Sequence, residues 1–414
     1  MHKIERLLQT LAPKGVEFKK IGELFKRNKG INITAAQMKE LHSEIGKVRI
    51  FAGGATKADI NYKDISKKDI INCESVIIKS RGNIGFEYYN QPFSHKNEIW
   101  SYSSKTNQML VKFLYYYLSN NQDYFQKLAQ SSSVKLPQLS VSDTDEYEVP
   151  IPPLEIQQEI VTILDAFTEL NTELNTELNA RKKQYEYYQN MLLDFNDINQ
   201  SRKDAKEKLA HKPYPKRLKQ LLHTLAPKGV EFRKLGEVCD FQKGKSITKK
   251  AVTFGKVPVI SGGRYPAYYH NEANRSGETI AISSSGVYAG YVSYWDIPVF
   301  LADSFSVSPK QKTLMPKYLF HYLTTQQDAI HAIKSTGGIP HVYSKDLQNF
   351  LIPIPPLEIQ QEIVKILDQF SLLTTDLLAG IPAEIKARKK QYEYYREKLL
   401  TFKPLTPLNN KELA

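Results

Sequence analysis

The residues that could perform chemistry lack the neighbours that each reaction requires. Gly244, Lys245 and Ser246 resemble the end of a phosphate-binding loop, but the position five residues before Gly244, which must be glycine, is Cys239. The sequence FAGGA at 51–55 loosely resembles a methyl-donor loop. Its glycine spacing is wrong, and no Asn/Asp-Pro-Pro-aromatic sequence follows to hold an extruded base. We therefore expect this chain to bind neither a nucleotide nor a methyl donor.

Hydrolytic and metal-dependent patterns are missing as well. The sequence contains no His-Glu-x-x-His and no Gly-x-Ser-x-Gly. Glu-x-Lys triplets occur at 17–19 and 384–386, but no Pro-Asp pair completes a nuclease site. The nine histidines are scattered and lack the spacing of metal ligands. The sequence thus predicts no catalytic residue, no metal site and no cofactor in this chain, and it favours a binding function.

The charge balance indicates an acidic partner. Lys and Arg number 57 against 44 Asp and Glu, so the formal net charge is +13, and a polyanion such as DNA or RNA is the natural ligand. The alternative is a basic protein that binds nothing acidic. Two cysteines exclude a disulfide framework and fit a reducing, cytoplasmic location. We find no signal-peptide pattern and no apolar run long enough to cross a membrane.

Basic and polar residues gather on loops at corresponding places in two globular segments. The stretches FKRNKGINIT (25–34) and KGKSITKK (243–250) place cations beside a glycine turn, which suits phosphate contacts. The turns SRGNIGF (80–86) and SSGVYAGY (284–291) could bring polar side chains to base edges. For each residue alone, a solvated surface loop is the alternative. The DNA-binding candidates are Lys26, Arg27, Lys29, Lys79, Arg81, Asn83, Lys243, Lys245, Lys249, Lys250, Arg264, Tyr265, Ser284, Ser285 and His341.

Duplicated segments must position these loops. The stretch PIPPLEIQQEIVTILDAF (150–167) returns at 353–370 with two differences in eighteen positions. LLQTLAPKGVEF (7–18) returns at 221–232 with one difference, and ARKKQYEYY (180–188) returns unchanged at 387–395. The first copy of LAPKGVEF opens the sequence, whereas the second follows a long helix. We therefore predict two repeats arranged as a circle, in which residues 1 to about 14 dock near the C-terminal helix.

The duplicated stretches predict long helices. Both copies at 150–167 and 353–370 read as helix starts, with proline in the first turn and Glu155 or Glu358 at the positive end of the helix dipole. Apolar residues recur every three or four positions, which predicts a helix–helix contact. Gly380 and Pro382 predict a kink or break. The partner or coiled-coil candidates are Ile156, Ile160, Ile163, Phe167, Leu170, Leu174, Leu178, Ile359, Ile363, Ile366 and Phe370.

The two globular segments repeat one plan with little shared sequence. Strands are predicted at 48–51, 75–79 and 98–102 in the first, and at 257–260, 279–283 and 299–302 in the second. A helix is predicted at 109–130 in the first segment. The stretch 317–323 in the second segment is the counterpart of the first part of that helix. The polar stretch 196–216 reads as a loose link. Near-identical helices beside unlike globular segments imply two identical partners and two different targets.

PIPPLEIQQEIV, the TELN sequence present three times at 168–179, RKKQYEYY and the duplicated LAPKGVEF together resemble the specificity subunit of type I restriction–modification systems. The resemblance covers the whole chain. It implies two target-recognition domains that each read half of a split, asymmetric DNA site, and two long antiparallel helices between them that act as a ruler. It also implies a subunit without a catalytic site that recruits two modification (methyltransferase) subunits and restriction subunits. S-adenosylmethionine, ATP and Mg²⁺ would belong to those partners.

The fold class expected is therefore α+β: two globular α/β target-recognition domains joined by two long antiparallel helices that form a coiled coil, with pseudo-two-fold organisation. The expected divisions are 1–148 (N-terminal segment and first domain), 149–215 (central helix and linker), 216–351 (second domain) and 352–414 (C-terminal helix and tail). Two alternatives stay open. One is a coiled-coil scaffold or orphan DNA-binding protein without a restriction role, and the other is a single-chain nuclease or methyltransferase.

Overall fold

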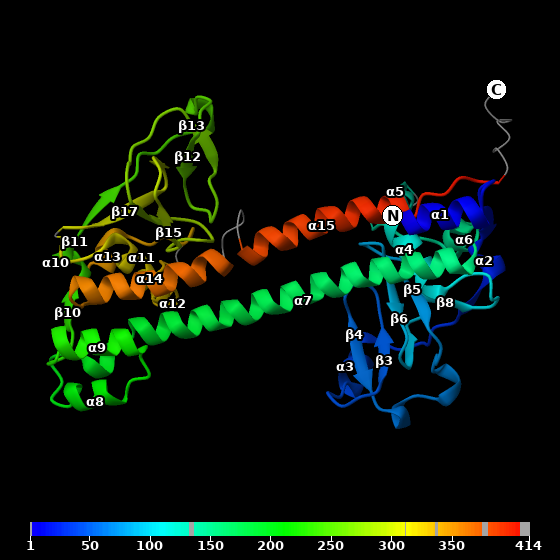
Figure 1. Cartoon of the computed structure of the whole chain (residues 1–414), viewed down its shortest axis with the longest axis horizontal. Helices are drawn as coiled ribbons and strands as arrows, with labels where there is room; N and C mark the ends of the chain where they lie inside the picture. Colours follow the sequence, from blue (N-terminus) through cyan, green and yellow to red (C-terminus); the bar gives the residue numbers. More distant parts are fainter. Residues whose placement is uncertain (1, 132–135, 311, 336–337, 375–379, 406–414) are drawn as a thin grey trace. The chain divides into compact units, whose positions relative to one another are not determined.

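The computed structural model describes residues 2–131, 136–310, 312–335, 338–374 and 380–405, and the chain divides into two compact units (Figure 1). Unit 1 consists of Met1–Leu174 together with Ile385–Ala414, and unit 2 consists of Asn175–Glu384. Each unit thus combines one globular domain with helical segments that are distant in the sequence. The divisions expected at 149–215 and 352–414 do not form units of their own, because both helical regions are shared between the two units.

Unit 1 contains helices and strands from both ends of the sequence. In chain order these are α1 (His2–Leu11), β1 (Glu17–Lys20), α2 (Ile21–Leu24), β2 (Phe25–Asn28), α3 (Ala35–Leu41), β3 (Val48–Phe51), β4 (Lys57–Ile60), two 3-10 helices (Tyr62–Asp64 and Lys67–Asp69), β5 (Ser75–Lys79), β6 (Gly85–Tyr89), β7 (Phe93–His95), β8 (Trp100–Ser104), α4 (Val111–Asn120), α5 (Gln122–Ser131), α6 (Val141–Asp145), β9 (Glu148–Ile151), the first part of α7 (Leu154–Leu193) and most of α15 (Gly380–Leu399).

Unit 2 begins within α7. Its further elements are a 3-10 helix (Asn196–Ile198), α8 (Ala205–His211), α9 (Lys216–Leu225), β10 (Glu231–Lys234), α10 (Leu235–Val238), β11 (Cys239–Lys243), a 3-10 helix (Lys249–Ala251), β12 (Val257–Ile260), β13 (Tyr268–His270), β14 (Thr279–Ser283), β15 (Val292–Trp295), β16 (Phe300–Leu301), β17 (Ser304–Pro309), α11 (Pro316–Thr325), α12 (Gln327–Ala332), α13 (Ser344–Leu347), β18 (Leu351–Ile354) and α14 (Leu357–Thr374).

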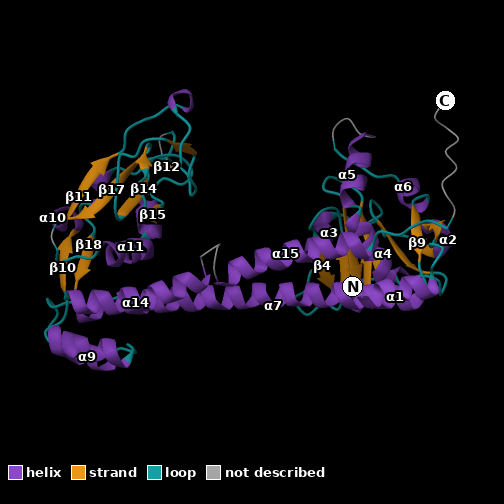
Figure 2. Ribbon diagram, turned by 45° about the horizontal axis from the view of Figure 1, so that its top comes forward, coloured by secondary structure: helices purple, strands orange, loops and turns teal. Residues whose placement is uncertain are grey.

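The two globular domains share one sheet topology, as the sequence predicted. A four-stranded antiparallel sheet has the order β2-β8-β5-β6 in unit 1 and β11-β17-β14-β15 in unit 2. A three-stranded sheet has the order β4-β3-β7 or β13-β12-β16, with one antiparallel and one parallel pair. Figure 2 draws the strands of both domains in orange. The strands predicted at 48–51, 75–79, 257–260 and 279–283 are confirmed without a shift. The helix predicted at 109–130 is instead two helices, α4 and α5, which meet at Asn121.

Each domain begins and ends on a two-stranded ribbon. In unit 1, β1 pairs with β9 in the register Glu17↔Ile151 to Lys20↔Glu148. In unit 2, β10 pairs with β18 in the register Glu231↔Ile354 to Lys234↔Leu351. Pro150 and its counterpart Pro353 lie in these ribbons, and every proline of the two duplicated stretches precedes the helix, so the prediction of proline in the first helical turn was wrong. The helices start after the following proline pair, at Leu154 and Leu357.

The N-terminal helix α1 packs against the C-terminal part of the chain and completes unit 1. Ile4 belongs to the same buried core as Leu399. The Val16 N–H donates to the Lys403 carbonyl at 2.9 Å, and the Leu405 N–H donates to the Val16 carbonyl at 3.0 Å. The predicted docking of the first residues near the C-terminal helix is thereby confirmed.

Unit 2 has the same pair of backbone hydrogen bonds, here between two segments of one continuous stretch of chain. The Val230 N–H donates to the Ile198 carbonyl at 2.8 Å, and the Gln200 N–H donates to the Val230 carbonyl at 2.9 Å. Here α9, which the second LAPKGVEF copy (225–232) follows, takes the place of α1. The two repeats therefore have the circular relation that the sequence predicted.

The polar stretch 196–216 is folded, so the prediction of a loose link was wrong. Ile198, Leu209 and Tyr214 are buried in the core of unit 2 beside Leu218 of α9. The Tyr214 hydroxyl also donates to the Asp194 carbonyl at 3.0 Å. The many Lys and Asp residues of this stretch hid an apolar face whose members are far apart in the sequence.

Aromatic contacts join the helices in each unit. In unit 1, Phe167 of α7 stacks on Tyr395 of α15, with ring centroids 5.7 Å apart. In unit 2, Tyr188 of α7 stacks on Phe370 of α14 at 5.0 Å. Phe167 and Phe370 occupy the same place in the two copies, and so do Tyr188 and Tyr395. The duplicated sequence therefore makes the same helix–helix contact twice.

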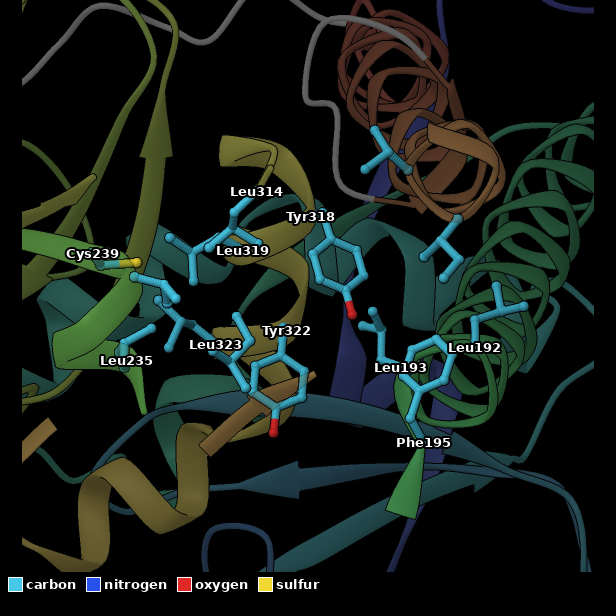
Figure 3. Close-up of a cluster of buried hydrophobic side chains, with 14 of the residues drawn as sticks. Leu192, Leu193, Phe195, Leu235, Cys239, Leu314, Tyr318, Leu319, Tyr322 and Leu323 are labelled. Atoms are coloured by element: carbon cyan, nitrogen blue, oxygen red, sulfur yellow. The ribbon is translucent and has the colours of Figure 1, made fainter. Parts of the chain in front are cut away.

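The remaining residues of the apolar stripe divide into two groups. Four isoleucines near the helix starts (Ile156, Ile160, Ile359 and Ile363) are fully buried in the cores that the helices share with their globular domains. Figure 3 shows such a core in unit 2, where Tyr318 of α11 points toward Leu193 at the end of α7 and Leu319 lies beside Leu314. Seven residues are half-buried, namely Ile163, Phe167, Leu170, Leu174, Leu178, Ile366 and Phe370. The stripe thus packs partly on its own domain and partly on a helix.

The TELN residues 168–179 are helical throughout, within α7. The break expected around Gly380 and Pro382 coincides with the start of α15 at Gly380, which places Pro382 in the first turn, where its missing N–H costs nothing. Residues 375–379, immediately before, lie outside the described part of the chain. The tail beyond residue 405 lies outside it as well.

A buried glutamine and a carboxylate attach each domain to its duplicated helix. Gln157 and its counterpart Gln360 are fully buried. In unit 2, Asp368 accepts from Lys317 at 2.6 Å and lies 3.1 Å from Nε2 of His321. Burial raises the pKa of Asp368, but the hydrogen bonds from His321 and Lys317 outweigh it and hold that pKa below its usual value. The carboxylate therefore remains charged where it anchors α11.

Candidate nucleic-acid interface

The basic loops of the two domains have the same backbone geometry. In unit 1 the Ile31 N–H donates to the His95 carbonyl at 2.7 Å, and in unit 2 the Lys245 N–H donates to the Leu301 carbonyl at 2.8 Å. In unit 1, Lys29 and Gly30 lie between this contact and β2, whereas in unit 2 Lys243 is the last residue of β11 and only Gly244 lies between. A Cβ on Gly30 would lie 2.5 Å from the Lys96 oxygen, and one on Gly244 would lie 2.5 Å from the Leu301 oxygen. Only glycine fits this close approach, so an exposed lysine precedes the same tight crossing in both domains.

The second candidate loop of unit 1 is a turn that is clamped to another segment. The Gly82 N–H donates to the Pro137 carbonyl at 2.9 Å, and the Leu139 N–H donates to the Ser80 carbonyl at 2.9 Å. Gly82 has φ +74°, which is the left-handed region that favours glycine. These bonds bring Arg81 opposite Gln138, and both side chains are exposed.

The turn of unit 2 repeats the clamp with other side chains. The Gly286 N–H donates to the Pro340 carbonyl at 3.0 Å, and Gly286 has φ +86°. Ser285 lies opposite His341, so the structure brings two sequence-predicted residues together. The Ser285 hydroxyl donates to the carboxylate of Asp303, which fixes the direction of the serine.

Both loops of a domain lie at the same end of its four-stranded sheet. β2 and β5 each pair antiparallel with β8, so they run in the same direction and finish at the same sheet end. The loop with Lys29 follows β2, and the turn with Arg81 follows β5. In unit 2, β11 and β14 have the same relation to β17, which brings the loop after Lys243 and the turn at Ser284 to one end.

The candidate DNA-binding cations differ in whether a carboxylate of this chain already forms an ion pair with them. Lys79 pairs with Glu87 at 2.7 Å, and Arg27 pairs with Asp145. A second group of candidate cations is exposed and forms no ion pair with any described residue. Its members are Lys26, Lys29, Arg81, Lys243, Lys245, Lys249 and Lys250. This second group retains the charge that a phosphate would meet.

Arg264 and the aromatic residues near it form a further cluster in unit 2. The Arg264 guanidinium lies 4.9 Å from the Tyr288 ring centroid and 5.6 Å from that of Tyr291. This places Arg264 beside the 284–291 turn, whereas Tyr265 is 77% exposed. The His341 ring stacks on Tyr343 with centroids 5.9 Å apart. Tyr288 and Tyr343 are exposed, whereas Tyr291 and His341 are half-buried, and all four lie in or beside the same turn.

Three residues at these loops were not predicted from the sequence. Gln138 is the counterpart of His341, and the signal was available, because each lies twelve residues before its PIPP sequence. Asp303 was hidden because a carboxylate is unexpected beside a polyanion. Arg275 holds β11 by hydrogen bonds. Its Nη2 donates to the Lys243 carbonyl of β11 at 2.8 Å, and its Nε donates to the Ser306 hydroxyl of the neighbouring strand β17 at 2.9 Å.

The described residues contain no group of three or more His, Cys, Asp or Glu side chains that could hold a metal ion. None of the helices in the described ranges is both long and apolar enough to span a membrane. A cavity of about 1150 Å³ in unit 1 is lined by Tyr124, Tyr147 and several carboxylates, including Glu17 and Glu146. It does not include the candidate loops.

The family comparison matches both repeats. The family model described as "Type I restriction modification DNA specificity domain" matches residues 13–183 and 227–387. This chain belongs to that family. Each match includes one globular domain and one copy of the duplicated helix, so the family identified from the sequence motifs is confirmed, as is the fold class of two such domains with long helices.

Relatives of this type I specificity family agree with the assignment. The specificity subunit of a type I restriction enzyme from Escherichia coli is 31% identical over 338 residues, which are 74% of this chain and 75% of the relative. A putative specificity subunit from Haemophilus influenzae is 32% identical over 348 residues, which are 80% and 83% of the two chains. The crystal structure of an S subunit from M. genitalium shares the fold, with a TM-score of 0.62 at 20% identity, over 95% of this chain and 96% of that one.

Proposed function

We propose that this chain is the DNA-specificity subunit of a type I restriction–modification complex, in which each domain reads one half of a bipartite, asymmetric DNA site. One observation carries the proposal. At the same sheet end of both domains, a matching pair of backbone hydrogen bonds presents different side chains. Arg81 faces Gln138 in unit 1, and Ser285 faces His341 in unit 2. A fixed frame with variable side chains is what two readers of different half-sites require.

Phosphate contacts would position each domain. Lys29 and Lys243 are exposed on equivalent turns, and each could neutralise one backbone phosphate. Base readout would then come from the turn residues in the major groove. Arginine suits the O6 and N7 acceptors of guanine, and glutamine suits the N6 and N7 positions of adenine. Arg81 and Gln138 therefore predict a purine contact for unit 1.

The helices would set the distance between half-sites and hold the partner subunits. The TELN residues 168–179 add three identical four-residue units to α7, each lengthening it by about 6 Å and rotating the remainder of the helix by roughly 40°. Because the helix–helix contacts at Phe167 and Phe370 are duplicated, two identical methyltransferase subunits are the expected partners, joined by restriction subunits for cleavage.

Catalysis would belong to those partners. Methylation needs S-adenosylmethionine, and ATP-dependent cleavage needs ATP and Mg²⁺, for which the sequence offers no binding motif in this chain. The target base would be flipped into the methyltransferase. Such a complex acts on DNA in the cytoplasm, which is where we place this chain.

Selection from random duplexes tests the proposal, with the chain in complex with its methyltransferase partner. We expect two constant half-sites at one fixed separation. Arg81→Ser should alter base preference in one half-site only, and Ser285→Arg should alter the other. A flat selection, or binding that does not weaken as salt rises, would instead favour a scaffold role and would refute the proposal.

A further inference from the structure

The segment that clamps each turn carries an exposed aliphatic residue followed by proline. Leu136 is 54% exposed and Ile339 is 68% exposed. Each immediately precedes the proline whose carbonyl accepts from the glycine of the turn, Gly82 in unit 1 and Gly286 in unit 2. The two aliphatic side chains therefore occupy the same place in the two domains.

Duplication alone does not account for this pair. Other exposed apolar residues repeat in the chain, such as Leu154 and Leu357, but they lie where the two copies are almost identical. Between 136–149 and 339–352, by contrast, only the prolines 137 and 340 and the aspartates 143 and 346 are the same. Single exposed apolar residues are ordinary on protein surfaces. An aliphatic residue that precedes proline at the same place in two otherwise divergent domains is not ordinary.

The aliphatic residue of unit 1 lies beside the groups proposed to read bases. In unit 1, the nearest atom to a Cβ placed on Gly82 would be Cδ1 of Leu136, at 3.9 Å, so this side chain lies next to the Arg81–Asn83 turn. Proline fixes the backbone that follows, and the next residue is paired across the clamp. An exposed aliphatic side chain beside base-reading groups is the kind of side chain that DNA-bending proteins insert into a base step.

We propose that Leu136 and Ile339 are wedges, each of which inserts between two stacked bases in the half-site read by its own domain. This inference rests on the proposed DNA-reading function. The wedge adds local unstacking and bending of the duplex to that function, and these help to release a base for the partner methyltransferase. The free energy of unstacking depends on which two bases form the step. The complex therefore selects the sequence of this step although no polar side chain contacts it.

Fluorescence of 2-aminopurine tests the wedge in the complete complex of this chain with its methyltransferase. The probe is placed at each position of the selected duplex in turn, and its fluorescence rises where stacking is lost. We expect one strongly enhanced step in each half-site besides the methylated base. Leu136→Ala should reduce that enhancement about fourfold or more in the first half-site only, and Ile339→Ala should do so in the second.

Two controls separate insertion from general damage. Leu136→Ile keeps an aliphatic wedge and should keep the enhancement. Leu351→Ala removes a leucine of equal exposure, 54%, from strand β18 and should change neither half-site. Sequence-specific binding with no extra enhanced step, or an enhancement that survives both alanine substitutions, overturns the wedge and leaves the proposed function intact. Absence of any half-site preference overturns the proposed function itself.

Discussion

Replacing Gln157 with methionine should destabilise unit 1 strongly although no catalytic or DNA-facing group is touched. The Gln157 side chain is fully buried. Its Oε1 accepts from the Leu110 N–H at 2.8 Å, and its Nε2 donates to the carbonyls of Gln108 at 2.8 Å and Pro152 at 2.7 Å. One side chain thus ties the loop before α4 to the start of α7.

The magnitude depends on the groups left behind. Methionine has a similar volume but can neither donate nor accept these bonds, so one N–H and two carbonyls lose their partner at buried or part-buried places. At about 1 to 1.5 kcal/mol for each group, the loss is about 3 to 4.5 kcal/mol of unfolding free energy. The neighbouring Gln158 is exposed, and Gln158→Met should change stability by less than about 0.5 kcal/mol.

Urea unfolding of the full-length chain measures this difference. The chain has two tryptophans, Trp100 in unit 1 and Trp295 in unit 2, so a Trp295→Phe background makes fluorescence report unit 1 alone. If the Gln157→Met and Gln158→Met variants unfold within about 1 kcal/mol of each other, the clamp is not what the geometry indicates. Gln360→Met against Gln361→Met repeats the comparison in unit 2, because Gln360 makes the matching bonds.

Three further outcomes are expected. Deleting residues 176–179, one TELN unit, should change the preferred half-site separation while both half-site sequences persist in a selection experiment; altered base preference at unchanged separation would refute the ruler. Burial lowers the pKa of His95, so its stabilising contribution is present above about pH 6.5 and lost as pH falls below it. Urea unfolding of unit 1 from about pH 7.5 to 5.5 should show this loss of unfolding free energy. His95→Leu introduces the residue that unit 2 has at the equivalent position, Leu301, and should make the unfolding free energy depend less on pH. An equally steep pH dependence in the variant would exclude His95 as the cause. Lys29→Ala and Lys243→Ala should each lower the slope of log affinity against log salt by about 1, without changing which sequence is selected; an unchanged slope would show that the lysine meets no phosphate.

Much of the architecture was predictable because it depends on local patterns. Short β-type runs between turn residues located the strands at 48–51 and 279–283, and the repeated LAPKGVEF sequence indicated the circular relation. The folded stretch 196–216 was not predictable in the same way. Its buried residues, such as Ile198 and Leu209, are separated by charged turns, and only tertiary contact makes them a single apolar face.

The candidate site was predictable in its loops but not in its pairs. Lysines beside glycine revealed the basic turns, since their chemistry is local. The partners Gln138 and Asp303 were missed because their roles depend on which segments the sheet brings together. The role of Gln157 was hidden for a related reason. A glutamine on an amphipathic helix reads as solvated, and only the packed structure shows that it bonds three backbone groups at buried or part-buried places.

The ribbons on which the domains begin and end have an evolutionary consequence. Lys20 pairs with Glu148, and Lys234 pairs with Leu351, so each domain enters and leaves its scaffold through one matched pair of positions. A foreign cassette with the same two ends could be grafted there without disturbing the register of the strands beneath. Genetic exchange at these two borders would replace the specificity for one half-site in a single step and leave the helical scaffold unchanged.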